Sequence, residues 1–235
     1  ENSNTLVLHA GDMMTGTAYC TLFKGQMNVE LMNMIGYQYM VIGNHEFDDG
    51  VSNILSLQKD AEFNLLSANI IDKETGDTLF TPYIVTNISE IDMAIIGLTA
   101  SDHSPFNQTI FDTIEIQDEI ITLSNLISDP VISLSNDLLI LLTHCGFIRD
   151  REIAMAFPEV DVIIGGHSHS KLRLPREVNG VRILQAGSHS EYIGRLDISV
   201  RNGKIIGRDY ELLTLSSAHF TNSVISRLDK KGIKR

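Results

Sequence analysis

The chain has 235 residues, of which 43% are hydrophobic and 20% are charged, and its formal net charge is -12. This composition supports a globular protein with a substantial core and excludes a disordered or fibrous chain. It also disfavours a nucleic-acid partner, because binding to the DNA or RNA backbone needs a basic face that releases counterions. We therefore expect an acidic globular protein that does not bind nucleic acid.

The hydropathy pattern gives no support for membrane insertion. The chain contains no run of about 18 or more apolar residues, the length that a membrane-spanning helix needs. No basic segment followed by an apolar stretch marks a signal peptide near Glu1. Cys20 and Cys145 are too few for a disulfide framework and lack the spacing of a zinc finger. The sequence predicts no membrane span and leaves the oligomeric state open.

In chain order, short apolar runs alternate with segments of helical periodicity. Strands are predicted over residues 5–10, 39–42, 63–68, 82–88, 92–98, 138–143, 161–164, 181–186, 192–200 and 204–210. Helices are predicted over residues 27–34, 51–59, 117–127 and 149–157. The alternation is typical of an α/β sheet. After about residue 172 strands dominate, with a hairpin turn at residues 201–204, so we expect a mixed second sheet packed on the first.

Four of the predicted strands end in residue types that bind metals. The strands are followed by Gly11-Asp12, by Gly43-Asn44-His45, by His144, and by Gly165-Gly166-His167-Ser168-His169. Open α/β sheets gather their chemistry at the carboxyl ends of their strands. We therefore expect these residues, which are far apart in the chain, to meet in one site.

The chemistry of this set points to transition metals. Carboxylate, amide and imidazole ligands together suit Zn, Mn, Fe or Co better than Ca, and they come from Asp12, Asn44, His144, His167 and His169. An Asp carboxylate can bridge two cations, and a pair of metals about 3.5 to 4 Å apart promotes in-line displacement at phosphorus. In an extended His-Ser-His segment both rings would face such a pair. Taken singly, Asp12 is equally well explained as a helix cap and Asn44 as a turn residue, but four clusters together favour metal binding.

His45 and Asp48 predict an acid and the carboxylate that orients it. They lie three positions apart, so Asp48 can hold one ring nitrogen and leave the other directed at a substrate. Such a pair can also be purely structural, and its position next to Asn44 favours the functional interpretation. Glu46 is expected to point away from His45 and to make a supporting hydrogen bond or ion pair.

The other histidines and Cys145 have simpler explanations. His9, His103 and His219 are expected to be structural or surface residues. The same holds for His189, although it follows a predicted strand end and an approach to the site stays open. Cys145 is expected to be a small buried residue rather than a ligand or a nucleophile.

The motifs together resemble the calcineurin-like metallophosphoesterases, specifically the catalytic domain of the 5'-nucleotidase branch. Four strings carry the resemblance: Gly-Asp-Met-Met-Thr-Gly at 11–16, Gly-Asn-His-Glu-Phe-Asp at 43–48, Thr-His-Cys-Gly at 143–146 and Gly-Gly-His-Ser-His at 165–169. Further matching stretches lie at residues 23–25, 29–33, 185–188 and 194–196. The resemblance implies a four-layered α/β-β/α sandwich of two mixed sheets flanked by helices.

The same resemblance implies a role for each site residue. Asp12 would bridge two divalent transition metals. Asn44, His144 and His167 would complete the second metal site, and His169 would bind the first metal. His45, positioned by Asp48, would stabilise the transition state or protonate the leaving alkoxide.

Two departures from the family pattern bear on the domain organisation. The family carries an Asp-x-His motif at the end of a first strand, and nothing upstream of Asp12 supplies it; His9 is no substitute, because Val7 stands where the Asp would be. The first metal is then left with Asp12 and His169. The 5'-nucleotidases also continue into a second, substrate-binding domain. We expect residues 1–220 to form a catalytic domain without its first strand and Asp-x-His motif, and residues 221–235 to begin a linker helix.

The function implied is metal-dependent hydrolysis of a small phosphorylated substrate, a nucleoside monophosphate or related nucleotide, by a metal-bound hydroxide. Two alternatives stay open. One keeps the superfamily and changes the substrate to a 2',3'-cyclic nucleotide, a nucleotide sugar, a pyrophosphate or a sulfur ester. The other is an inactive metal-binding remnant that serves as a surface or interaction protein. The resemblance implies a periplasmic or cell-surface location.

Overall fold

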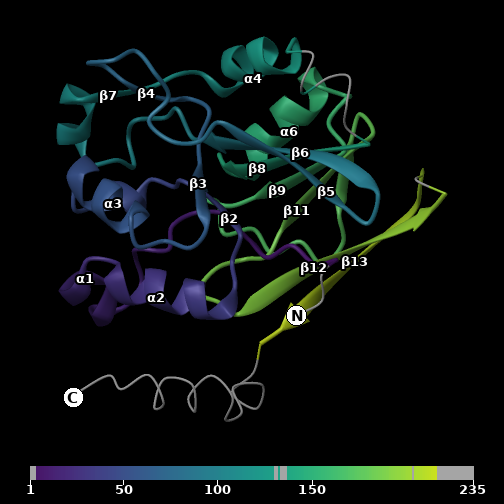
Figure 1. The fold of residues 1–235 in the computed structure, drawn as a ribbon, viewed down its shortest axis with the longest axis horizontal. Helices are drawn as coiled ribbons and strands as arrows, with labels where there is room; N and C mark the ends of the chain where they lie inside the picture. The colour runs from purple at the N-terminus through teal and green to yellow at the C-terminus, as the bar shows by residue number, and fades with distance from the viewer. Residues whose placement is uncertain (1–3, 130–131, 133–136, 203, 216–235) are drawn as a thin grey trace.

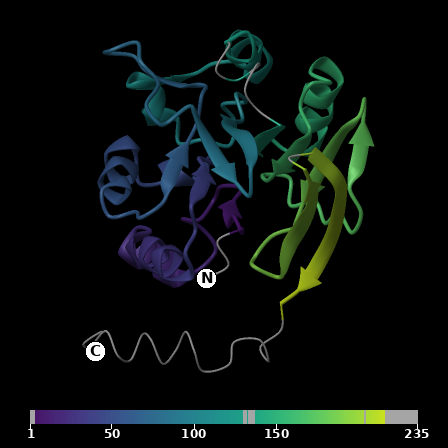
Figure 2. The same ribbon diagram turned by 45° about the vertical axis from the view of Figure 1, so that its right-hand side comes forward.

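Two β-sheets packed face to face form the centre of the fold, and helices cover the outer face of each (Figure 1, Figure 2). The structure is a computed structural model that describes residues 4–129, 132, 137–202 and 204–215. Its helices are α1 (Ala18–Phe23), α2 (Gln26–Ile35), α3 (Val51–Gln58), α4 (Glu119–Ile127) and α6 (Phe147–Ala156), with short 3-10 helices η1 (His45–Phe47) and η2 (Gln108–Asp112).

The strands divide between the two sheets and two separate pairs. They are β1 (Leu8–His9), β2 (Tyr39–Val41), β3 (Asn64–Leu66), β4 (Ile70–Asp72), β5 (Tyr83–Ile88), β6 (Ile91–Thr99), β7 (Ile114–Ile116), β8 (Leu138–His144), β9 (Val162–Gly165), β10 (Arg176–Val178), β11 (Val181–Gln185), β12 (Tyr192–Arg201) and β13 (Lys204–Thr214). The smaller sheet, β1-β2-β3, is parallel. The larger sheet runs β10-β11-β9-β8-β6-β5, with a parallel centre and an antiparallel strand at each edge.

The apolar runs form strands that are buried on both faces. All seven residues of β8 are buried. Leu139 and Leu141 pack with residues of α4 and α6, whereas Ile140 and Leu142 pack with residues of the smaller sheet. Side chains alternate between the two faces of a strand, so a strand between two apolar layers has no polar positions and reads as a continuous apolar run.

The smaller sheet shows the same alternation. Met40 and Ile42 pack against residues of α2 and α3, and Val41 packs against the larger sheet. The order of layers is therefore helix, sheet, sheet, helix, as Figure 2 shows from the side. The predicted four-layered α/β sandwich is confirmed, with the refinement that the described strands of the smaller sheet are all parallel.

Several details differ from the prediction. Helix α1 and strands β4, β7 and β10 were not predicted, because segments of three to six residues are too short to show a period. The C-terminal strands β12 and β13 pair with each other and do not join the second sheet, whereas β10 and β11 do. The predicted turn between β12 and β13 is correct, since Arg201 pairs with Lys204. The predicted linker at 221–235 and His219 lie outside the described residues.

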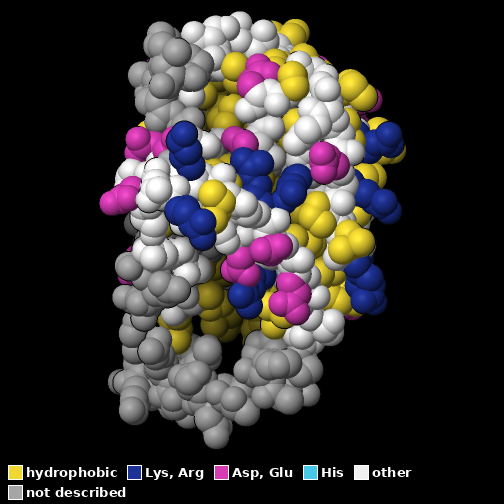
Figure 3. All heavy atoms as spheres, turned by 90° about the vertical axis from the view of Figure 1, so that its right-hand side faces the viewer, with side chains coloured by type: hydrophobic (Ala, Val, Ile, Leu, Met, Phe, Trp, Pro, Cys, Tyr) yellow, Lys and Arg dark blue, Asp and Glu magenta, His cyan; other side chains and the backbone are white. Residues whose placement is uncertain are grey.

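The charge is unevenly distributed over the surface. Residues 171–208 contain eight Lys or Arg and three Asp or Glu, in a chain whose net charge is -12. Figure 3 shows Lys and Arg side chains interspersed with apolar ones on one face of the molecule. Within the described ranges, no helix has the length and apolar character needed to cross a bilayer.

A buried acidic residue lies in the core beneath the carboxyl end of β8. Asp150 of α6 is fully buried, and its Oδ1 accepts a hydrogen bond of 2.7 Å from the Thr143 hydroxyl. Its Oδ2 has no hydrogen-bond partner among the described residues. Burial raises the pKa of Asp150 to about 7. The sequence interpretation overlooked this residue.

The close contact between the sheets makes Gly97 of β6 sensitive to substitution. A Cβ on Gly97 would lie 2.6 Å from Leu66 Cβ and 2.7 Å from the Leu66 carbonyl carbon. We expect Gly97→Ala to lower the free energy of unfolding by about 1 to 3 kcal/mol through overpacking, measured by denaturant titration. Gly207→Ala in β13 is the matched control, because its Cβ would lie 3.5 Å from Ser199 Cβ, and we expect a change below about 0.5 kcal/mol. Equal effects of the two substitutions would contradict this account of the sheet contact.

Asp150 predicts a pH dependence of stability. Its folded-state pKa lies above the ordinary value of 3.8, so between about pH 4 and 7 the folded state binds more protons than the unfolded state. Stability from this group is present below pH 4 and is lost as the pH rises to 7, by about 1.4 kcal/mol per unit of pKa difference. Asp150→Asn cannot ionise, so its stability relative to the wild type should rise from pH 4 to pH 8 in thermal unfolding. The exposed Asp112→Asn should leave the pH profile of the wild type unchanged, and a parallel profile for Asp150→Asn would refute the prediction.

Candidate metal centre

The candidate site forms where the carboxyl ends of strands from both sheets meet. Asp12 follows β1, Asn44 follows β2, His144 is the last residue of β8, and His167 follows β9. The two sheets are joined at this edge, because His144 Nδ1 lies 2.6 Å from the carbonyl oxygen of Ala10. A second link is the Thr99 hydroxyl of β6, which donates a hydrogen bond of 2.7 Å to the carbonyl of Ile42.

Asp12 and His144 face each other across the boundary between the sheets. His144 Nε2 lies 3.0 Å from Asp12 Oδ2, and the His144 side chain is 2% exposed. Burial alone would raise the pKa of Asp12, but the neighbouring His144 lowers it below its usual value. The pair is thus a buried carboxylate and a buried imidazole in direct contact.

The His144 ring is oriented as a metal ligand is. Its Nδ1 donates to a backbone carbonyl, which directs Nε2 at Asp12. Nε2 has no hydrogen-bond partner of good geometry among the described residues. Burial lowers the pKa of His144, but the contact with Asp12 outweighs it and raises this pKa above its usual value. Two ligand atoms on one ion, each about 2.0 to 2.2 Å from it, lie roughly 2.8 to 3.6 Å apart for angles between octahedral and tetrahedral. The separation of 3.0 Å between Asp12 and His144 fits that arrangement.

His167 and Asn44 extend the cluster. The ligand atoms of Asp12, His144 and His167 all lie within 4.8 Å of one another. His167 Nδ1 lies 3.0 Å from Asn44 Oδ1, and the amide nitrogen of Asn44 donates to the carbonyl of Pro105 at 3.4 Å, so the amide oxygen faces the cluster. Burial lowers the pKa of His167, and nearby His144 lowers it further, which favours the neutral ring that a metal ligand needs. Carboxylate, amide oxygen and imidazole donors therefore converge as a transition-metal site requires.

Glycines allow the strand ends to come this close. A Cβ on Gly43 would lie 2.3 Å from Asp12 Oδ1, and a Cβ on Gly166 would lie 2.3 Å from the Ala10 carbonyl oxygen. Both contacts are far shorter than van der Waals distance. The glycines that precede Asn44 and His167 in the motifs are thus required by the close approach of Asp12 and Ala10.

The Glu46 carboxylate fixes the backbone of the site through hydrogen bonds. The side chain is fully buried and accepts hydrogen bonds from the backbone N–H of Asp12 at 2.8 Å, of Gly43 at 2.6 Å and of Met13 at 2.7 Å. Burial raises the pKa of Glu46 to about 7, and the nearby Asp12 carboxylate also raises it. The supporting hydrogen bond that the sequence predicted for Glu46 is confirmed, and it connects the ends of β1 and β2.

His45 and Asp48 lie at the solvent side of the cluster. His45 Nδ1 is 2.8 Å from Asp48 Oδ2, and the two side chains are 39% and 47% exposed. The backbone N–H of His45 donates to Asp12 Oδ1 at 3.0 Å. Asp48 therefore holds one ring nitrogen, as the sequence predicted, and the pair is tied directly to the Asp12 carboxylate.

His169 is not among the three residues whose ligand atoms lie within 4.8 Å of one another, but it is close enough to His167 for their charges to interact. His167 and His169 both have positive φ angles, 70° and 54°, so the His-Ser-His segment is not extended. The His169 ring instead lies 5.7 Å, centroid to centroid, from the ring of His189. The expectation of an extended His-Ser-His segment is wrong, because His167 and His169 adopt left-handed backbone conformations. The role of His169 as a metal ligand stays a prediction. His189 does approach the predicted ligand His169.

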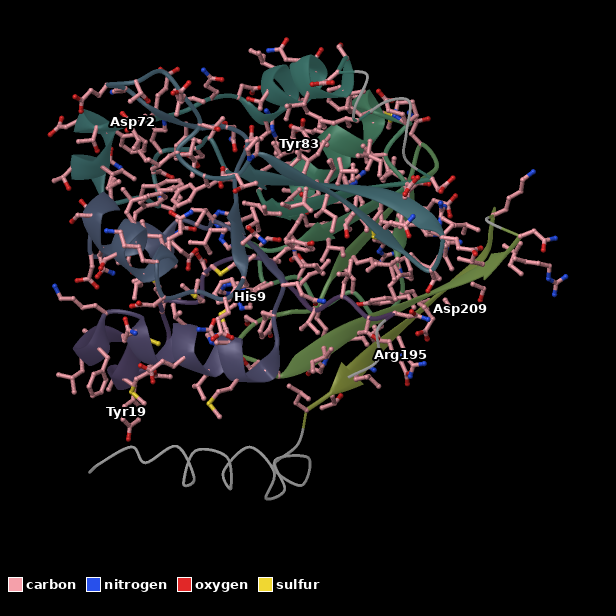
Figure 4. All side chains as sticks on the ribbon, in the orientation of Figure 1. His9, Tyr19, Asp72, Tyr83, Arg195 and Asp209 are labelled. Carbon is pink, nitrogen blue, oxygen red and sulfur yellow. The ribbon has the colours of Figure 1, made fainter. Side chains whose placement is uncertain are left out.

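Two other residues behave as expected. His9, labelled near the centre of the view in Figure 4, is half-buried; its Nδ1 accepts from the Gly11 N–H at 3.2 Å and its ring packs edge-on against Tyr37. Burial lowers the pKa of His9 to about 4. Cys145 is buried, and burial raises the pKa of its thiol, so it has neither the exposure nor the charge of a nucleophile.

The comparisons with known proteins agree with this geometry. A model of the calcineurin-like phosphoesterase family matches residues 1–171. The chain is 30% identical to a 5'-nucleotidase of Vibrio parahaemolyticus over 92% of this chain and 44% of the relative. It is 31% identical to Protein UshA of Escherichia coli, with 92% and 45% covered, and 32% identical to a human 5'-nucleotidase, with 98% and 44% covered. The chain spans less than half the length of these relatives.

Solved structures show the same fold. A 5'-nucleotidase precursor from Thermus thermophilus superimposes with a TM-score of 0.81 at 25% identity, covering 98% of this chain and 49% of that one. The sulfate thiohydrolase SoxB from the same genus gives a TM-score of 0.84 at 22% identity, covering 96% and 42%, and shows the fold alone. The strand-end motifs, the four layers and the family match lead to one conclusion: the chain belongs to the calcineurin-like phosphoesterase family.

Proposed function

We propose that this chain is the catalytic part of a metal-dependent phosphoric ester hydrolase of the 5'-nucleotidase type. The observation that carries the proposal is the Asp12–His144 pair, in which a buried imidazole nitrogen without a hydrogen-bond partner in the described structure faces a carboxylate at 3.0 Å. Relatives named 5'-nucleotidase, about 30% identical over most of this chain, support a nucleotide as the substrate. Calcineurin-like phosphoesterases use divalent metals, and the donor set suits Zn, Mn, Co or Fe.

The candidate ligands divide into one metal site with four protein ligands and one with two. Asp12, Asn44, His144 and His167 would hold one ion, and Asp12 with His169 would hold the other. When bound, such ions polarise the phosphoryl oxygens and lower the pKa of water. Glu46 keeps Asp12 in place through the backbone, and the Ala10 carbonyl fixes the His144 ring. These contacts reduce the reorganisation that binding requires.

His45 would act on the substrate. Its Nδ1 hydrogen bond to Asp48 fixes the ring and directs Nε2 away from Asp48, and the ring is exposed enough to be reached. In its protonated form, Nε2–H would donate to a phosphate oxygen or give its proton to the leaving alkoxide. A carboxylate behind a histidine fixes the orientation of the ring, which favours this role.

The choice among related substrates and the location are part of the proposal. Neighbouring solved structures include the sulfate thiohydrolase SoxB and the NAD nucleotidase NadN of Haemophilus influenzae, so one fold is used on phosphorus and sulfur esters. We favour nucleoside monophosphates, because two of the relatives reported above are named 5'-nucleotidases. The resemblance to this branch supports a periplasmic or cell-surface location.

The metal dependence gives the direct test. The purified chain should bind about two metals, by elemental analysis, and release phosphate from a nucleoside monophosphate when Mn, Co or Zn is added. Asp12→Asn should reduce the metal content and lower turnover at least about 100-fold, because it weakens the ligand shared by both ions and alters the charge at the site. One metal or none without turnover in the wild type would support the inactive remnant instead.

The His45–Asp48 pair gives an independent test. His45→Ala should lower kcat by about 100-fold or more while leaving the metal content unchanged, because His45 is not a ligand in the proposal. Asp48→Asn should lower kcat less, since the ring stays present but loses its orienting charge. Asp49→Asn is the matched control. The Asp49 carboxylate lies 3.4 Å from Lys24 Nζ, whereas Asp48 contacts His45, so this substitution should leave kcat unchanged. Equal turnover in His45→Ala and the wild type would exclude the proposed role.

A further inference from the structure

We propose that Gln185 is a positioning residue for the loop that carries His167 and His169, which we call the ligand loop (residues 166–170). The inference rests on the proposed function, since it concerns the same metal centre. Gln185 is the last residue of β11 and pairs with Gly165, the last residue of β9. Its side chain is 2% exposed. A buried amide thus lies beside the point where the ligand loop leaves the sheet.

All hydrogen bonds that the structure gives the Gln185 amide go to the ligand loop. Its Nε2 donates to the Gly166 carbonyl at 2.8 Å. Its Oε1 accepts from the Ser168 hydroxyl at 2.9 Å and from the Ser170 backbone N–H. The three contacted residues alternate with the two histidines. One side chain therefore fixes the loop before, between and after the predicted ligands.

Ser168 extends this connection to the His144 strand. Its hydroxyl oxygen accepts a hydrogen bond of 2.9 Å from the backbone N–H of Phe147, the first residue of α6. Phe147 follows His144 by three residues. The chain of contacts Gln185–Ser168–Phe147 thus connects β11, the ligand loop and the segment after β8. The middle residue of the His-Ser-His motif is a structural link between two ligand-bearing segments.

The backbone of the ligand loop needs such support. His167 and His169 have φ angles of 70° and 54°, in the left-handed region that residues with a Cβ rarely adopt. Such conformations persist only where the surrounding structure over-determines them. The Gln185 amide supplies that constraint, and the result is that the His167 ring lies against Asn44 and the Asp12–His144 pair. Without the amide, the loop would relax and the His167 ring would leave this position.

The test measures metal affinity rather than activity alone. Mn²⁺ should be titrated calorimetrically into the wild type and into Gln185→Ala, with unfolding temperatures measured in parallel. We expect the variant to bind Mn²⁺ about 10- to 100-fold more weakly, the usual effect of losing an outer contact to a metal ligand. Turnover should largely recover at saturating Mn²⁺, because the ligands themselves remain. A fold that had merely weakened would show a lower unfolding temperature while the folded fraction kept its Mn²⁺ affinity.

Gln38→Ala is the matched control. Gln38 is also a glutamine that bonds backbone groups, accepting from Val7 N–H at 2.6 Å and donating to the Thr5 carbonyl at 3.3 Å. It precedes β2, at the edge of the sheet opposite the site. We expect it to lower the unfolding temperature while leaving Mn²⁺ affinity within about threefold, the effect of less than 1 kcal/mol.

A second variant keeps the test decisive if Gln185→Ala fails to fold. Ser168→Ala removes only the exposed hydroxyl link and should weaken Mn²⁺ binding about 3- to 10-fold, the scale of one hydrogen bond. Combined with Gln185→Ala, its effect should be less than multiplicative, because the two side chains share one interaction.

Three results would overturn the inference. Mn²⁺ affinity equal to the wild type in Gln185→Ala, or in Ser168→Ala where the first variant does not fold, would exclude a positioning role. An equal loss of affinity in Gln185→Ala and Gln38→Ala would reduce the role to general stability. Failure of the wild type itself to bind Mn²⁺ would refute the proposed metal centre and the inference with it, whereas the first two results would leave the proposed function intact.

Discussion

The contact between Asp12 and His144 is the constraint on which the rest of the site depends. The two residues come from different sheets, and their side-chain atoms are 3.0 Å apart. This distance requires the carboxyl ends of β1 and β8 to meet, which only a face-to-face pairing of the sheets allows. The hydrogen bond from the His144 ring to the Ala10 carbonyl then makes the same contact part of the scaffold. The same two residues therefore connect the sheets and supply candidate metal ligands.

Polar groups buried at this point are costly, and the structure offsets the cost with backbone hydrogen bonds. Glu46 is fully buried close to the Asp12 carboxylate, and two negatively charged carboxylates at these positions would repel each other. Three backbone N–H groups directed at Glu46 compensate for its lost hydration. Asp12 and His167 also adopt left-handed backbone conformations. A site with this much strain and buried charge is maintained for its geometry rather than for stability.

The sequence was sufficient to predict which strand ends meet, because that depends on apolar runs and motif residues within each segment. Asp12, Asn44, His144 and His167 do come together. The left-handed backbone at His169 was not predictable in this way. The left-handed turn of its segment is held by Gln185, a residue 16 positions away on a neighbouring strand. Likewise, β4 and β7 are three-residue strands that pair with each other across 41 intervening residues.

The geometry also couples the metal ligand to the proposed acid. The backbone N–H of His45 donates to Asp12 Oδ1, while Oδ2 of the same carboxylate faces His144. Any displacement of Asp12 therefore moves the 3-10 turn η1 on which His45 and its Asp48 contact are built. Replacing the Asp12 carboxylate would disturb the ligand set and the acid together. Replacing the His45 ring would leave the backbone contact to Asp12 in place, so the reverse effect should be small. This asymmetry follows from a hydrogen bond made by the main chain of one residue to the side chain of the other.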